Sequence, residues 1–254
     1  MPKLFLMMAS LACLLMAAPA AAAGRTESVN FPAYDTIRGI DDYASPTEYR
    51  AAVADRRFVM EKISYASDGL TVYAYVYRPR SGLRNLPVII FNRGSWTWPT
   101  FSGELVTMAN RLARKGYLVV APMYRGSGGA AGRDELGGAE LDDLFNLLPV
   151  IKRMKMADTS HLYLYGESRG GMMVYQALRD GFPAKAAAVV GAFTDLDAML
   201  QDPRWAKAGE AIWPDLNSQR SAIVKRRSAV QWADRIGKPV LIIHGAKDSE
   251  VSVT

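Results

Sequence analysis

Cysteine and histidine are the residue types that this chain nearly lacks. Cys13 is the only cysteine among 254 residues, and His161 and His244 are the only histidines. A single cysteine cannot form an internal disulfide, so the fold must rely on a packed core. Histidine, cysteine and carboxylate residues do not cluster at metal-site spacing, and no G-x-G-x-x-G lies where a strand would lead into a helix. The sequence therefore predicts neither a metal nor another cofactor.

The chain also lacks a dense basic stripe. Its 31 lysines and arginines are scattered, without interleaved aromatics, and give a formal net charge of +6. This distribution argues against nucleic acid as a partner and favours a mildly basic solvated surface. Half of the residues are hydrophobic and 22% are charged, which is typical of one globular domain with a substantial core.

Long apolar runs are absent except at the N-terminus. There Lys3 precedes an apolar run from Leu4 to Ala18, and Ala21–Ala23 fits the A-x-A cleavage pattern. The run is shorter than the roughly 20 residues that a membrane-spanning helix needs. We interpret residues 1–23 as a signal peptide that directs the protein to the periplasm or the exterior. An uncleaved membrane anchor is the alternative.

Residues 24–57 are mixed and polar, and they predict an N-terminal lead-in segment with a short capped helix at 45–56. Two segments that alternate apolar and polar residues then flank Asp68 and Gly69. This pattern predicts a β-hairpin with a tight turn.

Beyond the hairpin, short apolar runs alternate with stretches of helical periodicity, which predicts an α/β fold: a mostly parallel sheet with helices on both faces, over residues 58–254. Ligand sites in such sheets lie beyond the carboxyl ends of the strands. The segment from about 193 to 236 interrupts the alternation and is expected to form a helical cap over that edge. The predicted strands are 86–92, 117–124, 161–166, 184–192 and 238–245, and the predicted helices are 102–116, 138–154 and 168–181.

A Gly-x-Ser-x-Gly pattern at residues 166–170 lies between a predicted strand and a predicted helix. A sharp turn at such a junction exposes the serine hydroxyl above the sheet, so Ser168 is the candidate nucleophile. Gly166 and Gly170 relieve crowding, and the helix N-terminus favours developing negative charge. A glycine-rich turn that only packs a helix on a strand is the alternative.

Several segments together resemble the α/β-hydrolase superfamily, and more narrowly the catalytic domain of the prolyl oligopeptidase family, from about Arg57 to the end. The resemblance implies a serine hydrolase with a Ser, Asp, His triad in that chain order. In "HGAKDSEVSV", Asp248 matches the position of the acid, which would orient an imidazole. The segments that carry the resemblance are "APMYRGSGG" (121–129), "GGAELDDL" (137–144), "YGESRGG" (165–171) and "RSAVQWADRIGKPVLIIHGAKDSEVSV" (227–253).

The oxyanion hole needs two donors. One is expected from the backbone N–H of Arg169, the residue after the nucleophile. The other is expected from the loop after the strand at 86–92, where "FNRGSWTWP" departs from the His-Gly-Gly run or tyrosine of the family. The Asn92 amide is the candidate, with the backbone of Arg93 or Gly94 as the alternative.

The sequence has no histidine at the position that the triad of this family implies. The resemblance implies a position some tens of residues after the acid, but the sequence stops at Thr254, six residues past Asp248. His161 opens the strand that leads to Ser168 and so lies at the wrong edge of the sheet. His244 lies at the right edge, where the resemblance implies a structural role and a substitute role stays open. We interpret the chain as a truncated hydrolase that lacks the last strand and helix of the fold.

These observations predict an exported serine hydrolase that cleaves a small peptide or ester through an acyl-enzyme. Its activity is expected to be impaired without the base. The alternative is a non-catalytic secreted protein that binds a ligand on the same scaffold. Three tryptophans, Trp96, Trp98 and Trp213, are candidates to line a pocket near the cap or merely to pack there.

Overall fold

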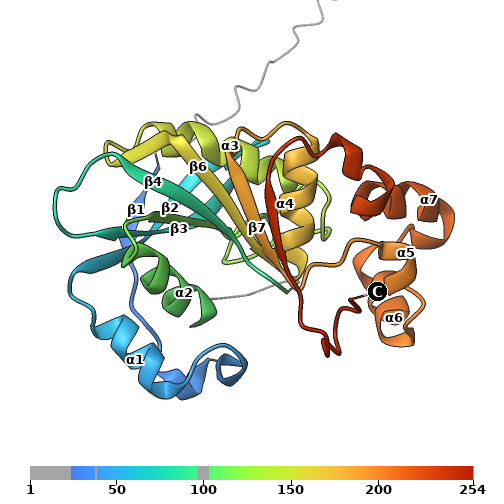
Figure 1. The fold of residues 1–254 in the computed structure, drawn as a ribbon, viewed down its shortest axis with the longest axis horizontal. Coiled ribbons are helices and arrows are strands. Elements are labelled where there is room, and N and C mark those ends of the chain that lie inside the picture. The colour runs from blue at the N-terminus through green and yellow to red at the C-terminus, as the bar shows by residue number, and fades with distance from the viewer. Residues whose placement is uncertain (1–23, 38, 96–102, 254) are drawn as a thin grey trace, which may run out of the picture.

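The computed structural model describes residues 24–253, apart from Arg38 and residues 96–102, and its centre is a twisted eight-stranded sheet (Figure 1). The strand order is β1-β2-β3-β5-β4-β6-β7-β8. The strands are β1 (Thr26–Ser28), β2 (Phe58–Ser67), β3 (Leu70–Pro79), β4 (Leu86–Asn92), β5 (Leu118–Pro122), β6 (Ala157–Glu167), β7 (Ala186–Val190) and β8 (Val240–Ile243).

The five strands from β5 to β8 in this order run parallel to one another, and β1, β2 and β3 add antiparallel pairs on one side. β4 and β5 are almost fully buried, as the continuous apolar runs of the sequence predict for strands covered on both faces. The sequence-based prediction of a mostly parallel α/β sheet with a leading hairpin is therefore confirmed.

The hairpin turn follows from two residues. Asp68 and Gly69 adopt φ angles of 49° and 79°, the left-handed conformation that a two-residue turn between β2 and β3 requires. The first strand, β1, pairs with β2 and was not predicted, because its three exposed residues show no alternation. In the same lead-in segment, Ser45 and Glu48 form a reciprocal capping box at the start of a helix.

Helices cover the sheet from two sides. One apolar cluster packs α3 and α4 against the sheet, and another packs α1 and α2 against it. The start of α4 is buried beneath these layers. These helices are α1 (Pro46–Ala54), α2 (Gly103–Ala113), α3 (Leu141–Lys152) and α4 (Arg169–Arg179).

Between β7 and β8 the chain forms three further helices and two short 3-10 turns. Figure 1 shows them beside α4 at the end of the molecule where the C-terminal segment also lies. They are α5 (Leu196–Met199), α6 (Pro203–Ile212), α7 (Leu216–Arg227), η3 (Ala229–Gln231) and η4 (Ala233–Arg235). None of the helices in the described part of the chain is both long and apolar enough to cross a membrane.

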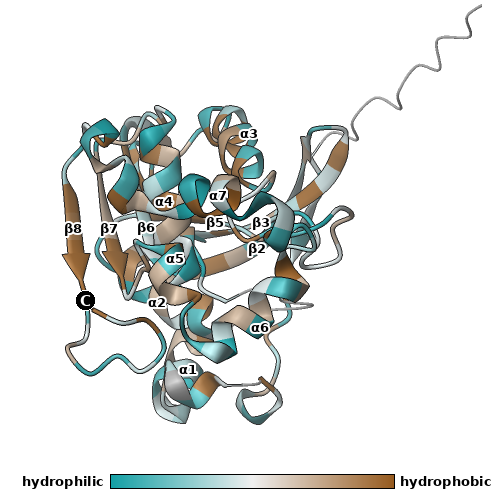
Figure 2. Ribbon diagram, turned by 90° about the vertical axis from the view of Figure 1, so that its right-hand side faces the viewer, coloured by the Kyte–Doolittle hydropathy of each residue, from teal (hydrophilic) through white to brown (hydrophobic). Residues whose placement is uncertain are grey.

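β8 departs from the expectation that both faces of the sheet are covered. Its side chains Leu241, Ile242 and Ile243 are 60%, 62% and 49% exposed, although the strand is purely aliphatic. Successive side chains point to opposite faces of a strand, so both faces of β8 are open in the described structure. Figure 2 shows this apolar strand at the edge of the sheet.

Candidate active site

Ser168 occupies a sharp turn between β6 and α4. It adopts φ 48° and ψ −119°, an uncommon and strained conformation for a residue with a side chain. Its backbone N–H donates to the carbonyl of Val190 at 2.8 Å, which holds the turn against the end of β7. The residue is half-buried rather than sealed in the interior. The hydroxyl therefore belongs to a residue that a ligand can approach.

Two glycines allow this turn. A Cβ at Gly166 would collide with the carbonyl of Gly170, and a Cβ at Gly170 would collide with the carbonyl of Asn92. The neighbouring atoms are backbone atoms in a packed core, so they have little freedom to move away. The glycines thus let the end of β4 and the start of α4 approach each other next to Ser168.

Asp248 lies in the loop after β8. Its Oδ1 accepts hydrogen bonds from the backbone N–H groups of Glu250 and Val251, both at 2.9 Å. The Val251 bond is the main cause that holds the pKa of Asp248 below its usual value, and the Glu250 bond and the charge of His244 act in the same direction. Oδ2 points toward Gly191, where a Cβ would lie 3.3 Å away.

The sheet register brings the two residues to one edge. Glu167, Val190 and Ile243 lie opposite one another at the ends of β6, β7 and β8. Ser168 directly follows the first of these strands, and Asp248 follows the third by five residues. Two strand spacings amount to roughly 10 Å, so both residues follow strands that end at the same edge of the sheet, with Gly191 after the strand between them.

Neither histidine lies beside Ser168 as a free base. Nε2 of His244 lies 2.9 Å from the carbonyl of Val251 and 3.4 Å from Oδ2 of Asp248. A carbonyl can only accept, so Nε2 is the nitrogen that carries the proton and donates it. His161 is exposed, and its Nδ1 lies 2.6 Å from Oδ2 of Asp158 near the start of β6. The first histidine ties the Asp248 loop together, and the second lies toward the opposite edge.

The Asn92 side chain, which the sequence predicts as an oxyanion donor, is fully buried and makes other hydrogen bonds in the structure. Its Nδ2 donates to the carbonyls of Ile90 at 3.2 Å and Tyr165 at 3.1 Å, while its Oδ1 accepts from the Tyr124 hydroxyl. Both amide hydrogens are thus used, one within β4 and one to join β4 to β6. A Cβ at Gly94 would lie 3.5 Å from Cβ of Ser168, so the backbone alternative remains for this loop.

The Arg169 backbone N–H begins α4, and the first N–H groups of a helix have no acceptor within it. The Arg169 side chain has a separate role. It is 2% exposed, and its Nη2 donates to Oδ1 of Asp134 at 2.8 Å and to Oε1 of Glu140 at 3.0 Å. Sequence reasoning missed these two carboxylates, because they lie 35 and 29 positions away in a glycine-rich loop.

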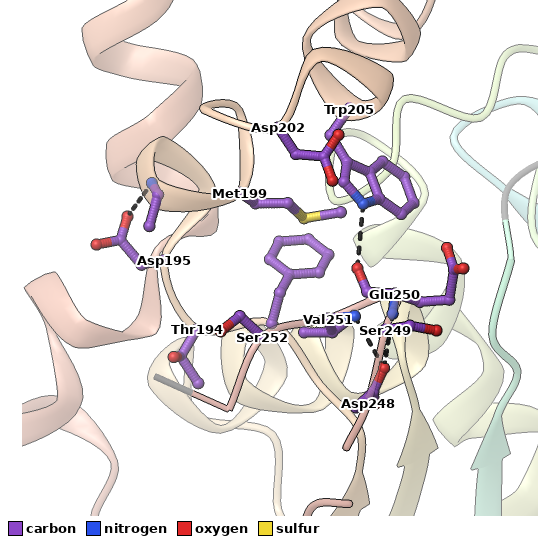
Figure 3. A pocket seen from close by; sticks show the side chains of 12 residues that line it. Thr194, Asp195, Met199, Asp202, Trp205, Asp248, Ser249, Glu250, Val251 and Ser252 are labelled. Carbon is purple, nitrogen blue, oxygen red and sulfur yellow. Dashed lines mark hydrogen bonds between the residues drawn. The ribbon is translucent and has the colours of Figure 1, made fainter. Parts of the chain in front are cut away.

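A cavity of about 370 Å³ lies next to Asp248, between the helices that follow β7 and the segment 248–252 (Figure 3). Met199 and Trp205 come from α5 and α6, and Nε1 of Trp205 donates to the carbonyl of Glu250 at 3.1 Å. Phe193 adds a second ring to the lining. The helices after β7 therefore supply an apolar wall beside the candidate acid.

Trp213, which the sequence singled out, is not among the residues that line this cavity. Trp213 is buried, donates through Nε1 to the carbonyl of Glu135, and has Arg227 over its ring. Trp96 and Trp98 lie outside the described residues, as does the predicted signal peptide at 1–23. Within the described residues, no three histidine, cysteine or carboxylate side chains gather as a metal site would require.

One known protein family matches the part of the chain that contains Ser168 and Asp248. The model of the prolyl oligopeptidase family matches residues 99–254, which include Ser168, Asp248 and the helices after β7. The chain belongs to the prolyl oligopeptidase family. Membership supports a hydrolase of the serine-peptidase type.

Individual relatives are similar over part of their length. The uncharacterized peptidase YtmA of Bacillus subtilis is 26% identical over 155 residues, 56% of either chain. The dipeptidyl aminopeptidase BIII of Pseudoxanthomonas mexicana is 28% identical over 207 residues, 72% of this chain and 30% of the relative. The chain thus spans about half of the first relative and less than a third of the second.

Solved structures share the fold. The acylaminoacyl peptidase of Pyrococcus horikoshii superposes with a TM-score of 0.63 at 20% identity, over 83% of this chain and 35% of that one. A puromycin-hydrolyzing peptidase of Mycobacterium tuberculosis gives a TM-score of 0.59 at 24% identity, over 74% of this chain and 31% of that one. At these identities the likeness concerns the α/β-hydrolase fold.

Proposed function

We propose that this protein is an exported serine hydrolase that cleaves peptide or ester bonds through an acyl-enzyme, with Ser168 as nucleophile. The observation that carries the proposal is the strained, half-buried Ser168 at the N-terminus of α4. Its Oγ would attack the carbonyl carbon and lose its proton to a base, and the leaving amine or alcohol would take that proton. Water would then release the acyl group.

Asp248 would serve as the acid of the triad. Oδ1 is held by two backbone N–H groups, which leaves Oδ2 on the Gly191 side, toward the strand that bears Ser168. The separation of roughly 10 Å between the two strand ends leaves room for one imidazole ring between carboxylate and hydroxyl. A ring in that place would receive a proton from Ser168 and be stabilised in its charged form by Asp248.

Peptides are the favoured substrate class, because the named relatives are peptidases. Phe193, Met199 and Trp205 form one wall of the cavity beside Asp248, and an apolar side chain of the substrate would pack on that wall. The rest of the lining is polar and includes the carboxylates of Asp195, Asp202 and Glu250. Ester cleavage needs the same nucleophile and oxyanion donors, so it stays part of the proposal.

We infer that the base is neither of the two histidines in this sequence. The Nε2–H of His244 donates to the Val251 carbonyl, and His161 is hydrogen-bonded to Asp158 near the start of β6. A serine without a base is a weak nucleophile at neutral pH. The activity of the 254-residue chain by itself is therefore expected to be several orders of magnitude below that of a complete triad.

A fluorophosphonate probe tests the proposal directly. The serine oxygen forms a bond to phosphorus and displaces fluoride, so intact-protein mass spectrometry reports the adduct. We expect labelling to be lost in Ser168→Ala and kept in Ser160→Ala, a control at an exposed serine of β6. The measurement is made on the 254-residue chain and on a version extended by any downstream coding sequence.

The outcomes separate the two functions. Labelling that is strong only in the extended version places the base beyond residue 254. Labelling of neither version, with a peptide ligand still bound, would favour the non-catalytic binding protein. Labelling that persists in Ser168→Ala would refute the assignment of the nucleophile.

Export is tested separately. The protein expressed with residues 1–23 in a Gram-negative host should appear in the periplasmic fraction and begin at Gly24 on N-terminal sequencing. Recovery of the unprocessed chain in the membrane fraction would instead favour the anchor.

A further inference from the structure

A buried guanidinium lies beneath the loop that faces Ser168. Arg93 is 3% exposed, and its Nη1 donates to the carbonyls of Gly94 at 3.1 Å and Ser95 at 3.2 Å. Its Nη2 donates to the carbonyl of Met123 at 3.1 Å and to Oγ of Ser127 at 3.0 Å. One side chain thereby joins the loop after β4 to the loop after β5.

The same guanidinium is coupled to the residue after the nucleophile. Nη2 of Arg93 lies 3.7 Å from Oδ2 of Asp134, and Oδ1 of Asp134 accepts from Nη2 of Arg169 at 2.8 Å. Arg93, Asp134 and Arg169, here called the arginine bridge, therefore connect the two segments that meet at Ser168. Glu140 bonds to Arg169 as well, so two cations and two carboxylates are buried together and their formal charges cancel.

The Tyr124 ring adds to this packing. It lies 4.4 Å from the guanidinium carbon of Arg169 and 5.6 Å from that of Arg93, and its hydroxyl donates to Asn92. Burial is the main cause that lowers the pKa of Arg93 to about 10, and the charge of Arg169 acts in the same direction. That value still lies well above neutral pH, so Arg93 remains a cation with all its donors.

The bridge ends at two strained residues. Ser95 and Ser168 adopt φ angles of 59° and 48° without being glycine. Such conformations are strained and persist only where the surroundings hold them. Arg93 holds the first through the Ser95 carbonyl, and Asp134 with Arg169 holds the turn that contains the second.

Peptide geometry links this anchoring to catalysis. In a trans peptide the C=O and the N–H point in opposite directions. The Gly94 carbonyl faces the Arg93 guanidinium. The N–H of the same peptide unit, which belongs to Ser95, therefore points away from the guanidinium. Arg93 thus fixes the direction in which the peptide units of the loop at 92–95 point relative to an oxyanion.

We propose that Arg93 is a positioning residue of the active site, which through the arginine bridge sets the loop at 92–95 in register with the N–H of Arg169. Its effect on catalysis rests on the proposed function. The mechanical coupling of the two segments does not, because it follows from the hydrogen bonds of the two arginines and from the ion pair between Arg93 and Asp134.

Two variants and a matched control test the coupling. Arg93→Met removes every donor but keeps much of the side-chain volume, and Asp134→Asn weakens the bridge while leaving the carbonyl contacts of Arg93 in place. The control, Arg125→Met, removes a guanidinium that is 7% exposed and pairs with Asp143 and Asp68 instead.

Hydrogen exchange on the 254-residue chain gives the first readout. We expect Arg93→Met and Asp134→Asn to raise exchange about tenfold in residues 88–95 and 167–173. Arg125→Met should raise exchange only around residues 65–70 and 141–147. Unchanged exchange at 167–173 in both bridge variants would overturn the proposal, and so would the same increase there in the control.

Fluorophosphonate labelling of Ser168 gives the second readout. Arg93→Met should lower the maximal labelling rate roughly tenfold to a hundredfold and leave the half-saturating probe concentration unchanged. Arg93→Lys should recover only part of the rate, since an ammonium cannot reproduce the guanidinium fork. A wild-type labelling rate in Arg93→Met would contradict the proposal. The variants are made in whichever wild-type version is labelled, the 254-residue chain or the extended one. If neither version is labelled, the proposed function fails, and exchange alone decides the bridge.

Discussion

The carboxylate of Asp248 shows how single hydrogen bonds organise this site. Two backbone N–H groups hold Oδ1, and His244 lies 3.4 Å from Oδ2 while donating to the Val251 carbonyl. The two backbone hydrogen bonds and the nearby His244 favour the ionised form of Asp248. Together with the His244–Val251 bond, they fold residues 244–251 into a compact loop. The aspartate that would orient an imidazole is therefore itself oriented before any substrate binds.

This arrangement predicts an acid-sensitive loop. The pKa of Asp248 is lower in the folded protein than in the unfolded chain, mainly because the Val251 N–H bonds to the carboxylate. The stabilisation is therefore present above the unfolded pKa near 4 and is lost as the pH falls through the lower folded value. Asp248→Asn should remove this pH dependence and weaken the loop by about 1 kcal/mol at neutral pH.

Amide exchange at Glu250 and Val251, followed from pH 6 down to acid, measures this effect. Asp234→Asn, at an exposed position outside the loop, serves as the control. A loop in Asp248→Asn that retains the wild-type pH dependence would show that another group is responsible.

At the scale of elements, the junction of β6 and α4 depends on glycine, which has no side chain. A Cβ on Gly170 would meet the Asn92 and Arg93 carbonyl oxygens, both from the end of β4 and the loop after it. The strand, the turn and the helix can approach this closely only because glycine has no side chain. The close approach brings the loop after β4 within reach of Ser168.

Gly170→Ala should therefore destabilise the protein by about 3 kcal/mol or more, because backbone atoms of a packed core cannot yield cheaply. Gly237→Ala is the matched control: no heavy atom lies within 4 Å of its Cβ position, so the change should be neutral or mildly stabilising. Urea unfolding followed by circular dichroism measures both. Equal stability of the two variants would show that the turn relaxes more easily than its contacts indicate.

At the scale of the whole molecule, the aliphatic strand β8 forms an exposed edge of the sheet. Leu241 and Ile242 are each about three-fifths exposed, whereas Val189 on the neighbouring β7 is fully buried. An aliphatic edge strand with free backbone groups is a template for pairing with another chain. We therefore expect the 254-residue chain to self-associate through this edge.

Ile242→Lys should reduce that association at little cost, within about 0.5 kcal/mol, since it places a charge on an exposed edge. Val189→Lys, in a buried strand, should lower the free energy of unfolding by several kcal/mol. Sedimentation velocity over a range of concentrations and urea titrations measure the two quantities. Unchanged self-association in Ile242→Lys would show that the chain associates through a surface other than β8.

Local patterns determined much of this protein in advance. Periodicity and apolar runs predicted the hairpin and the parallel strands, because these elements are defined by hydrogen bonds and side-chain directions within short segments. The turn at Ser168 was predicted for the same reason, since two glycines, a serine and their flanking strand and helix lie within a few residues. The short strand β1 carried no such pattern and was missed.

Tertiary structure alone decided how the polar groups around Ser168 are used. Asn92 joins β4 to β6 instead of facing an oxyanion, and Arg93 meets Asp134, 41 positions away, beneath the nucleophile. The openness of β8 likewise depends on what packs against it. A donor's partner is set by which segments fold against it, and no pattern within one segment records that choice, because the contacting residues are tens of positions apart in the chain.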